Sequence, residues 1–150
     1  MKTIADVMSR DVTSVSPEES IRRAAELMED LDVGALPVTE GQRLIGMITD
    51  RDITIRATAA GLGPEETQVA EIMTEDICHC YEDQGTDEVM QDMRDIQIRR
   101  VPVVSRDDHT LIGIVALADL VESETDDSKT AQTLLEISAP LPAGRASTPL

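Results

Sequence analysis

Few residues of this chain have the types and neighbours that covalent chemistry requires. Its two histidines, His79 and His109, fall in different predicted elements, and no Ser or Cys nucleophile stands beside a base that could activate it. No glycine-rich loop that could hold a phosphate opens a predicted helix. The sequence therefore predicts a protein that is not an enzyme.

The segment Cys78-His79-Cys80 has residue types that bind zinc but not the spacing of a zinc site. Three adjacent residues of a strand cannot all point toward one ion. Cys78 and Cys80 would face the same side of a strand, which is an awkward geometry for a disulfide. We therefore expect two free thiols in a reducing compartment, and no metal site.

The elements that position these residues come from an internal repeat. Residues 4–38 align with residues 69–103 at a constant offset of 65 residues, and the alignment resumes after a two-residue insertion near Ser105. One structural unit has therefore been used twice. The matched segments are Val7-Met8-Ser9 with Ile72-Met73-Thr74, Leu36-Pro37-Val38 with Val101-Pro102-Val103, Leu44-Ile45-Gly46 with Leu111-Ile112-Gly113, and Asp52 with Asp119.

Each copy has the pattern strand, helix, strand, strand, helix, behind a short lead-in helix. Residues 16–19 read as a helix start with Ser16 as the cap, and the helix should run to about Asp30. Apolar runs at residues 35–38 and 44–49 predict two strands, and residues 50–60 predict a second helix. Neither copy can cover its own small sheet, so the two copies should pack around one interface.

The repeats also set the expected domains. We expect repeat 1 over residues 4–60, a linker with Gly and Pro over residues 61–68, and repeat 2 over residues 69–122. Residues 123–150 lose periodicity and gain Ser, Thr, Pro and Asp, which predicts a partly disordered C-terminal tail. The predicted fold class is α+β, and each repeat contributes a three-stranded sheet and two helices.

Composition argues against several classes of partner. The chain has 30 acidic and 13 basic residues, and its net charge of −17 repels nucleic-acid backbones and anionic lipids. One Tyr, with no Phe or Trp, leaves no stacking platform for single-stranded nucleic acid. No stretch approaches the about 18 apolar residues of a membrane span. We expect a cytoplasmic protein that binds neither nucleic acid nor membranes.

Three motifs follow one another in the first repeat and return in altered form in the second. They are Val7-Met8-Ser9, Gly34-Ala35-Leu36-Pro37-Val38 and Gly46-Met47-Ile48-Thr49-Asp50-Arg51-Asp52-Ile53. In this order the chain resembles a tandem CBS-domain protein, or Bateman module, over roughly residues 4–122. Residues 46–63 are especially similar to small stand-alone CBS proteins of the hypoxic response protein type. The resemblance implies two repeats packed with pseudo-two-fold symmetry into one module, and pairing of such modules into a homodimer.

The resemblance also implies a site for an adenine nucleotide. In similar proteins the last acidic residue of a Gly-apolar-apolar-Thr-x-x-Asp motif holds the ribose, and here this residue is Asp52, preceded by Ile48 and Thr49. A carboxylate can accept two hydrogen bonds from a cis-diol, and free N–H groups at a helix start favour phosphate. The same Thr-x-x-Asp spacing is close to a capping box, in which both side chains only satisfy backbone N–H groups. Both interpretations stay open.

Two arginines complete the site that the resemblance implies. In similar modules a basic residue just before the apolar-Pro-apolar strand of the other repeat meets the phosphate, and Arg100 has this position, with Arg99 beside it. The alternative for both arginines is a surface ion pair, which would contribute little to stability. The adenine is expected near Ile77 and Cys78.

The two repeats are not equivalent at these positions. The second motif ends in Asp119 but has Ala116 where the first has Thr49, and Ala35 stands where repeat 2 has Arg100. We therefore expect one competent nucleotide site and one degraded site.

Two functions are compatible with the sequence. In the first, the chain is a regulatory sensor that needs no obligatory cofactor, binds AMP, ADP, ATP or NAD, and changes conformation so that an unidentified protein partner can read its state. Binding drives such a change only through unequal affinity for the two states. In the second, the chain binds no small ligand and acts as a protein-interaction or stress-response adaptor.

Overall fold

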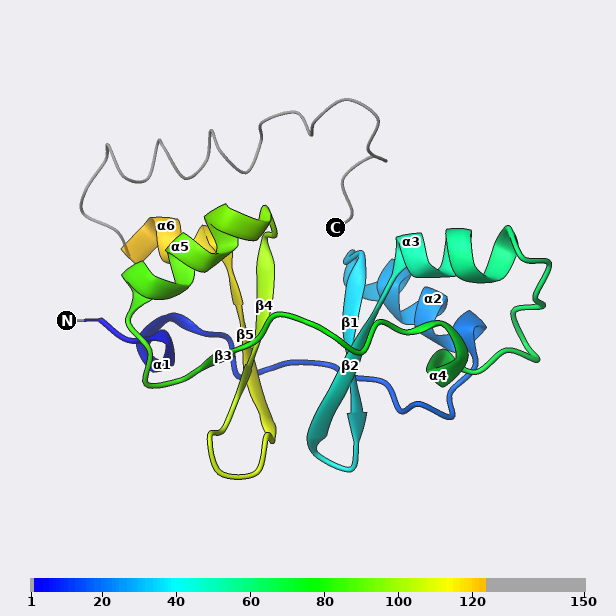
Figure 1. Cartoon of the computed structure of the whole chain (residues 1–150), viewed down its shortest axis with the longest axis horizontal. Helices are drawn as coiled ribbons and strands as arrows, with labels where there is room; N and C mark the ends of the chain where they lie inside the picture. The colour runs from blue at the N-terminus through cyan, green and yellow to red at the C-terminus, as the bar shows by residue number, and fades with distance from the viewer. Residues whose placement is uncertain (1, 124–150) are drawn as a thin grey trace. The chain divides into compact units, whose positions relative to one another are not determined.

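The computed structural model describes residues 2–123, which form two compact units (Figure 1). Within the described range, unit 1 consists of residues 2–12, 78–108 and 112–123, and unit 2 consists of residues 13–77 and 109–111. Both units combine short sheets with helices, which confirms the predicted α+β class. The predicted C-terminal tail lies, apart from Ser123, outside the described residues.

Unit 2 contains one hairpin and four helical segments. Strands β1 and β2 pair antiparallel from Ala35 opposite Thr49 to Glu40 opposite Arg43, as the apolar runs predicted. The turn between them uses Gly41, whose φ of 64° lies in the left-handed region that glycine tolerates. The elements are α2 (Ile21–Leu31), β1 (Ala35–Glu40), β2 (Arg43–Thr49), α3 (Asp50–Asp52), the π-helix η1 (Ile53–Thr58) and α4 (Val69–Ile72).

The first long helix begins later than the sequence predicted. Ser20, not Ser16, is the N-cap of α2, and its hydroxyl accepts a hydrogen bond of 3.1 Å from the N–H of Arg23. Residues 16–19 form a turn instead, because the carbonyls of Pro17 and Glu19 accept hydrogen bonds from the first N–H groups of α4. The expected cap at Ser16 was therefore wrong, since this segment serves a contact distant in sequence.

The first predicted strand of repeat 1 is reduced to a single residue. Val15 forms a parallel bridge to Val38: its N–H donates to Pro37 at 3.0 Å, and its carbonyl accepts from Thr39 at 2.9 Å. The turn at residues 16–19 ends the extended segment directly after Val15. Unit 2 therefore has a two-stranded sheet where three strands were expected.

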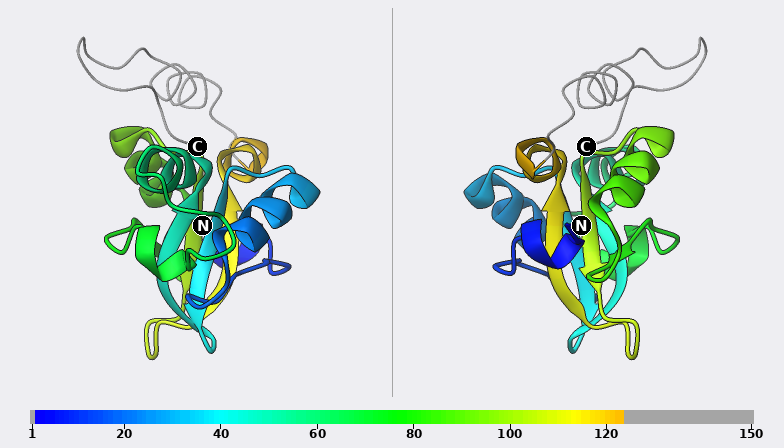
Figure 2. Two further views of the ribbon diagram at one scale, coloured as in Figure 1. Left: turned by 90° about the vertical axis from the view of Figure 1, so that its right-hand side faces the viewer. Right: turned by 90° about the vertical axis from the view of Figure 1, so that its left-hand side faces the viewer.

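Unit 1 has the three-stranded sheet that the repeat predicts, in the order β3-β4-β5. Strand β3 runs parallel to β4, with Cys80 opposite Val103 and Tyr81 opposite Val104. Helices pack on this sheet through a shared apolar core (Figures 1 and 2). The elements are α1 (Ile4–Val7), β3 (Cys80–Tyr81), α5 (Thr86–Ile96), β4 (Arg100–Val104), β5 (Leu111–Ala116) and α6 (Leu117–Ser123).

Each unit takes its lead-in helix from the other repeat. Helix α1 opens repeat 1 but lies in unit 1, where Ile4 is fully buried among residues of repeat 2. Helix α4 opens repeat 2 but lies in unit 2, where Val69 and Ile72 join the core of repeat 1. The compact units therefore differ from the sequence repeats by an exchange of lead-in helices.

The residue that follows each lead-in helix pairs with the second strand of the hairpin. Thr74 exchanges two backbone hydrogen bonds with Met47, at 2.8 and 2.9 Å, and Ser9 does the same with Ile114. The approach requires glycine on the strand, because a Cβ at Gly46 would lie 2.8 Å from the carbonyl oxygen of Thr74. The repeated glycines therefore serve close backbone packing.

The cores are aliphatic, as the composition predicts. Apolar residues at helical spacing place Met28, Met90 and Met93 on the inner faces of α2 and α5, and all three are buried in the core. Leu31 and Ile96 continue the same helical spacing but are 45% and 49% exposed, because they lie at the ends of α2 and α5. Among the described residues, no helix has the length and hydropathy needed to cross a membrane.

Candidate functional site

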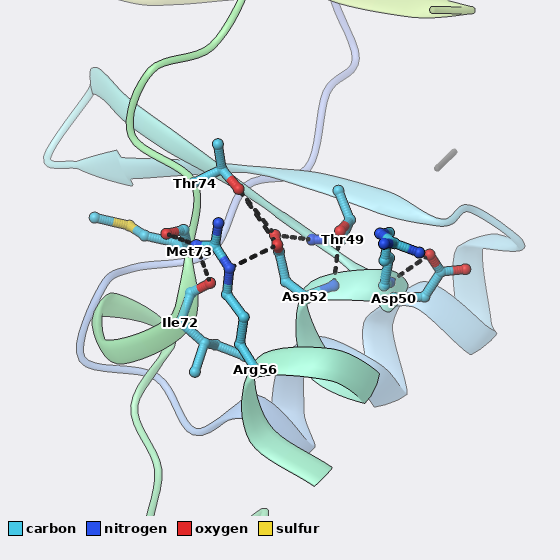
Figure 3. A network of polar contacts seen from close by, with 8 residues as sticks. Thr49, Asp50, Asp52, Arg56, Ile72, Met73 and Thr74 are labelled. Atoms are coloured by element: carbon cyan, nitrogen blue, oxygen red, sulfur yellow. Dashed lines mark hydrogen bonds and ion pairs between the residues drawn. The ribbon is translucent and has the colours of Figure 1, made fainter. Parts of the chain in front are cut away.

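Thr49 and Asp52 lie at the junction where β2 passes directly into α3. Thr49 has extended backbone angles and caps the helix, and its hydroxyl accepts a hydrogen bond of 3.0 Å from the N–H of Asp52. The Oδ2 atom of Asp52 accepts a hydrogen bond of 3.1 Å from the N–H of Thr49 (Figure 3). The capping box, one of the two interpretations that the sequence allowed for Thr49 and Asp52, is therefore formed.

Asp52 has more partners than a capping box requires. Its carboxylate also accepts from the hydroxyl of Thr74, at 3.3 Å to each oxygen. The Nε atom of Arg56 lies 3.7 Å from Oδ1. Asp52 is only 8% exposed, so these groups replace most of the water that would solvate the carboxylate. The result is a carboxylate held in place from three segments of unit 2 (Figure 3).

Arg56 extends this network to the end of α4. Its Nη1 atom donates to the carbonyl oxygens of Ile72 and Met73, at 3.3 and 3.1 Å (Figure 3). Arg56 lies in the π-helix η1, whose backbone hydrogen bonds join residues five apart instead of four. Its side chain is 53% exposed. One guanidinium therefore joins Asp52 to backbone carbonyls of the exchanged helix.

Sequence reasoning missed both Arg56 and Thr74. Arg56 follows Asp52 by four residues on a predicted helix, a spacing at which opposite charges meet, and this was the available signal. Thr74 ends the motif that aligns with Val7-Met8-Ser9, but the alignment could not show that it would meet Asp52, which lies 22 residues away. These two residues complete the polar surroundings of Asp52.

The equivalent junction in unit 1 has fewer polar contacts. Asp119 Oδ2 accepts a hydrogen bond of 3.0 Å from the N–H of Ala116, which has no hydroxyl to return the bond. Ser123 stands at the position of Arg56, and its hydroxyl donates to the carbonyl of Leu120 at 2.9 Å. The network of Thr49, Asp52, Arg56 and Thr74 therefore has no full counterpart in the described part of unit 1.

The remaining predicted site residues lie in different surroundings. Arg99 and Arg100 are exposed at the start of β4 in unit 1, and within residues 2–123 neither side chain makes an ion pair. Ile77 and Cys78 are half-buried in the segment before β3. The side chain of Ile48 is fully buried in the core of unit 2, so only its backbone is left to meet a ligand.

The two thiols are held in their neutral form. Burial first, and then the nearby Cys78 and Asp92, together raise the pKa of Cys80 to about 12. The pKa of Cys78 is also raised, first by burial and then by Asp92. Metal binding and nucleophilic attack both require the thiolate. Neither cysteine has the surroundings of a reactive thiol, and residues 2–123 contain no cluster of three His, Cys, Asp or Glu residues arranged for a metal ion.

Comparison with known proteins agrees with the repeat. The CBS domain family model matches residues 4–57 and 69–126. The chain is 40% identical over 121 residues to hypoxic response protein 1 of Mycobacterium tuberculosis, covering 80% of this chain and 83% of that protein. The resemblance seen in the sequence motifs is thereby confirmed.

Solved structures support the same assignment. A crystal structure of Hypoxic Response Protein I with two coordinated zinc ions matches with a TM-score of 0.73 and 39% identity, covering 82% of this chain and 99% of that chain. The CBS domain pair of protein MJ0100, in complex with 5-methylthioadenosine and S-adenosyl-L-methionine, matches with a TM-score of 0.68 and 27% identity, covering 82% of this chain and 95% of that chain. This chain belongs to the CBS-domain family and carries two CBS domains.

Proposed function

We propose that this chain is a regulatory module that binds an adenine nucleotide through Asp52 and Thr49, without catalysing a reaction. The observation that supports the proposal most is the difference between the two units. Unit 1 completes its helix junction with Asp119 and Ala116 alone, whereas unit 2 surrounds Asp52 with Thr49, Arg56 and Thr74. Because unit 1 forms the same junction without the additional polar groups, the fold does not require them, and ligand binding would explain why unit 2 has them.

The chemistry of Asp52 suits a sugar. An ionised carboxylate offers about four acceptor positions. The cap uses one, and the hydroxyl of Thr74 contacts both oxygens at 3.3 Å, where a hydroxyl of a ribose diol would also donate. A ribose could therefore replace Thr74 at the carboxylate while the cap with Thr49 stays formed. The ligands of MJ0100, 5-methylthioadenosine and S-adenosyl-L-methionine, share the adenosine group that this contact would recognise.

Arg100 and Arg99 are the proposed phosphate contacts. Both are exposed and, within residues 2–123, neither side chain makes an ion pair, which supports a phosphate contact over the surface ion pair considered for them. Backbone groups near Ile48, Ile77 and Cys78 would meet the adenine. In this proposal the nucleotide shifts a conformational equilibrium of a homodimeric cytoplasmic module, and a partner protein reads the change.

Thermal unfolding with AMP, ADP, ATP, NAD and S-adenosylmethionine tests the proposal. A ligand that binds only the native state stabilises it by about 2.7 kcal/mol when its concentration is about 100 times the dissociation constant. We expect at least one of these ligands to raise the midpoint, Asp52→Asn and Arg100→Ala to abolish or weaken the shift, and Asp119→Asn to leave it unchanged. If no ligand raises the midpoint at roughly millimolar concentration, the adaptor function is favoured instead.

A further inference from the structure

Arg56 connects two parts of unit 2, the carboxylate of Asp52 and the end of α4. Its Nε atom faces the carboxylate of Asp52, while Nη1 donates to the last carbonyl oxygens of α4 and the residue that follows, Ile72 and Met73. Arginine can serve both ends because its planar guanidinium carries five N–H donors in a fixed geometry. Figure 3 shows the side chain lying between the carboxylate and these two carbonyl groups.

Thr74 forms a second connection between Asp52 and the end of α4. Its hydroxyl donates to Asp52, and its backbone exchanges hydrogen bonds with Met47 of β2. The end of α4 is thus attached to Asp52 twice, through Arg56 and through Thr74. A change at the carboxylate therefore acts directly on the α4 end.

The fold does not need this attachment. In unit 1 the lead-in helix α1 is followed by Ser9, which pairs with Ile114 through the same two backbone hydrogen bonds. Ser123 stands at the position of the arginine there, and its hydroxyl donates to the carbonyl of Leu120 in its own helix. A unit of the same design is thus complete without an arginine, so the role of Arg56 is specific to the Asp52 site.

We propose that Arg56 is a positioning residue of the Asp52 site, which holds the carboxylate for the ligand and ties the state of Asp52 to the α4–Thr74 segment. The proposal rests on the proposed nucleotide function and adds to it the element that responds to binding. When ribose hydroxyls take the place of Thr74 at the carboxylate, the end of α4 loses its hydrogen bond to Asp52 through Thr74. This segment continues directly into residues 75–79, which lead to β3.

Amide hydrogen exchange at Met73 and Thr74 tests the tie without any ligand. The N–H of Met73 donates to Val69 at 2.9 Å, and the N–H of Thr74 donates to Met47 at 2.8 Å, so both amides report opening of the α4 end. We expect Arg56→Ala to speed exchange at both amides about tenfold, the effect of losing a charge-assisted hydrogen bond. Asp52→Asn should do the same, and the double variant should add little to either change.

Three controls separate positioning from a general loss of stability or charge. Arg23→Ala removes the same charge from an exposed site on α2 and should leave both amides unchanged. The amide of Ser9, which makes the equivalent bond in unit 1, should not change in any variant. Arg56→Lys keeps the charge, but a lysine ammonium cannot reach the carboxylate and both carbonyls together. Exchange at Met73 and Thr74 should therefore be about as fast as in Arg56→Ala.

AMP supplies the second readout. We expect AMP to speed exchange of the Thr74 amide in the wild-type chain, to have little effect on it in Arg56→Ala, and to bind that variant about fivefold more weakly. Unchanged exchange in Arg56→Ala, additive effects of Arg56→Ala and Asp52→Asn, or full rescue by Lys would overturn the proposal. If neither AMP nor another nucleotide binds the wild-type chain, the nucleotide function fails, but the double-variant comparison still decides whether Arg56 ties Asp52 to α4.

Discussion

Replacing Asp52 by Ala should destabilise the chain much more than the matched change Asp119→Ala. At Asp52 the change removes the reciprocal cap to the N–H of Thr49 and the acceptor for the hydroxyl of Thr74, and leaves the guanidinium of Arg56 without its carboxylate. At Asp119 it removes one hydrogen bond, from the N–H of Ala116. The two aspartates occupy equivalent positions in the repeat, so the comparison isolates the network.

The contacts give the expected size of the difference. A lost cap costs about 1 kcal/mol. A hydrogen bond to a charged group contributes about 1.5–3 kcal/mol. The ion pair with Arg56 adds only about 0.3–0.5 kcal/mol, because the arginine side chain is 53% exposed and water screens the pair. These terms overlap, so we expect about 2–4 kcal/mol for Asp52→Ala and about 1 kcal/mol for Asp119→Ala.

Urea unfolding followed by far-UV circular dichroism measures the difference in the absence of nucleotide. Tyr81 is the single aromatic residue of the chain and lies in unit 1, so its fluorescence follows unit 1 separately from the total signal. Asp30→Ala is the charge control, because this exposed carboxylate lies on α2 and any loss of negative charge relieves repulsion in a chain of net charge −17. Equal destabilisation by Asp52→Ala and Asp119→Ala would refute the reasoning, since it would assign the effect to the cap alone.

Two further predictions follow from backbone packing and from thiol burial. Gly46→Ala and Gly113→Ala should each cost about 2–3 kcal/mol in urea unfolding, because the added Cβ would lie 2.8 and 2.7 Å from a backbone carbonyl oxygen. Gly63→Ala is the control, since its Cβ would meet the flexible end of a glutamate side chain, and a cost as large as at Gly46 would contradict the packing argument. Because burial raises the pKa of Cys80 to about 12, its contribution to stability is complete below the ordinary thiol pKa of 9.0 and is lost as the pH rises from there toward 12. The free energy of unfolding should fall by up to about 1.4 kcal/mol per pH unit in this range, and Cys80→Ala should show a shallower fall when urea midpoints are compared across it. An equal slope in both proteins would show that the thiol is not protected, and so would rapid reaction of Cys80 with a thiol reagent ahead of Cys78.

The sequence predicts the fold class and the repeat because both depend on local pattern. Short apolar runs and the shared Pro and Gly positions identify the hairpins, and helical spacing identifies Met28 and Met93 as core residues. The cap at Ser16 was wrong because a good local signal competed with a contact to α4, which is distant in sequence. An alignment of two repeats likewise says that a lead-in helix exists, but not which repeat it packs on.

The candidate site divides in the same way. Thr49 and Asp52 could be identified from the sequence because their spacing and their place at a helix start are local. The wider turn of η1, which carries Arg56, could not be identified, since nothing in residues 53–58 distinguishes a π-helix from an α-helix. Thr74 could not be connected to Asp52 without knowing that α4 joins unit 2.

The exchange of lead-in helices affects how such a chain can be divided or inherited. A break within residues 61–68 would leave two fragments. The first would carry α1, which completes the core of repeat 2, and the second would carry α4, which completes the core of repeat 1. Each fragment would therefore lack the lead-in helix that covers its own core. Such fragments should complement one another and should fold poorly when made separately. A piece ending just beyond Thr74 would instead keep α4 with the core that it completes. A gene for one repeat alone could complete its core only with a helix donated by a second copy of itself, and fusing two such copies would have supplied the donor at a fixed high local concentration. Recombination that separates the repeats would therefore remove part of the core from both.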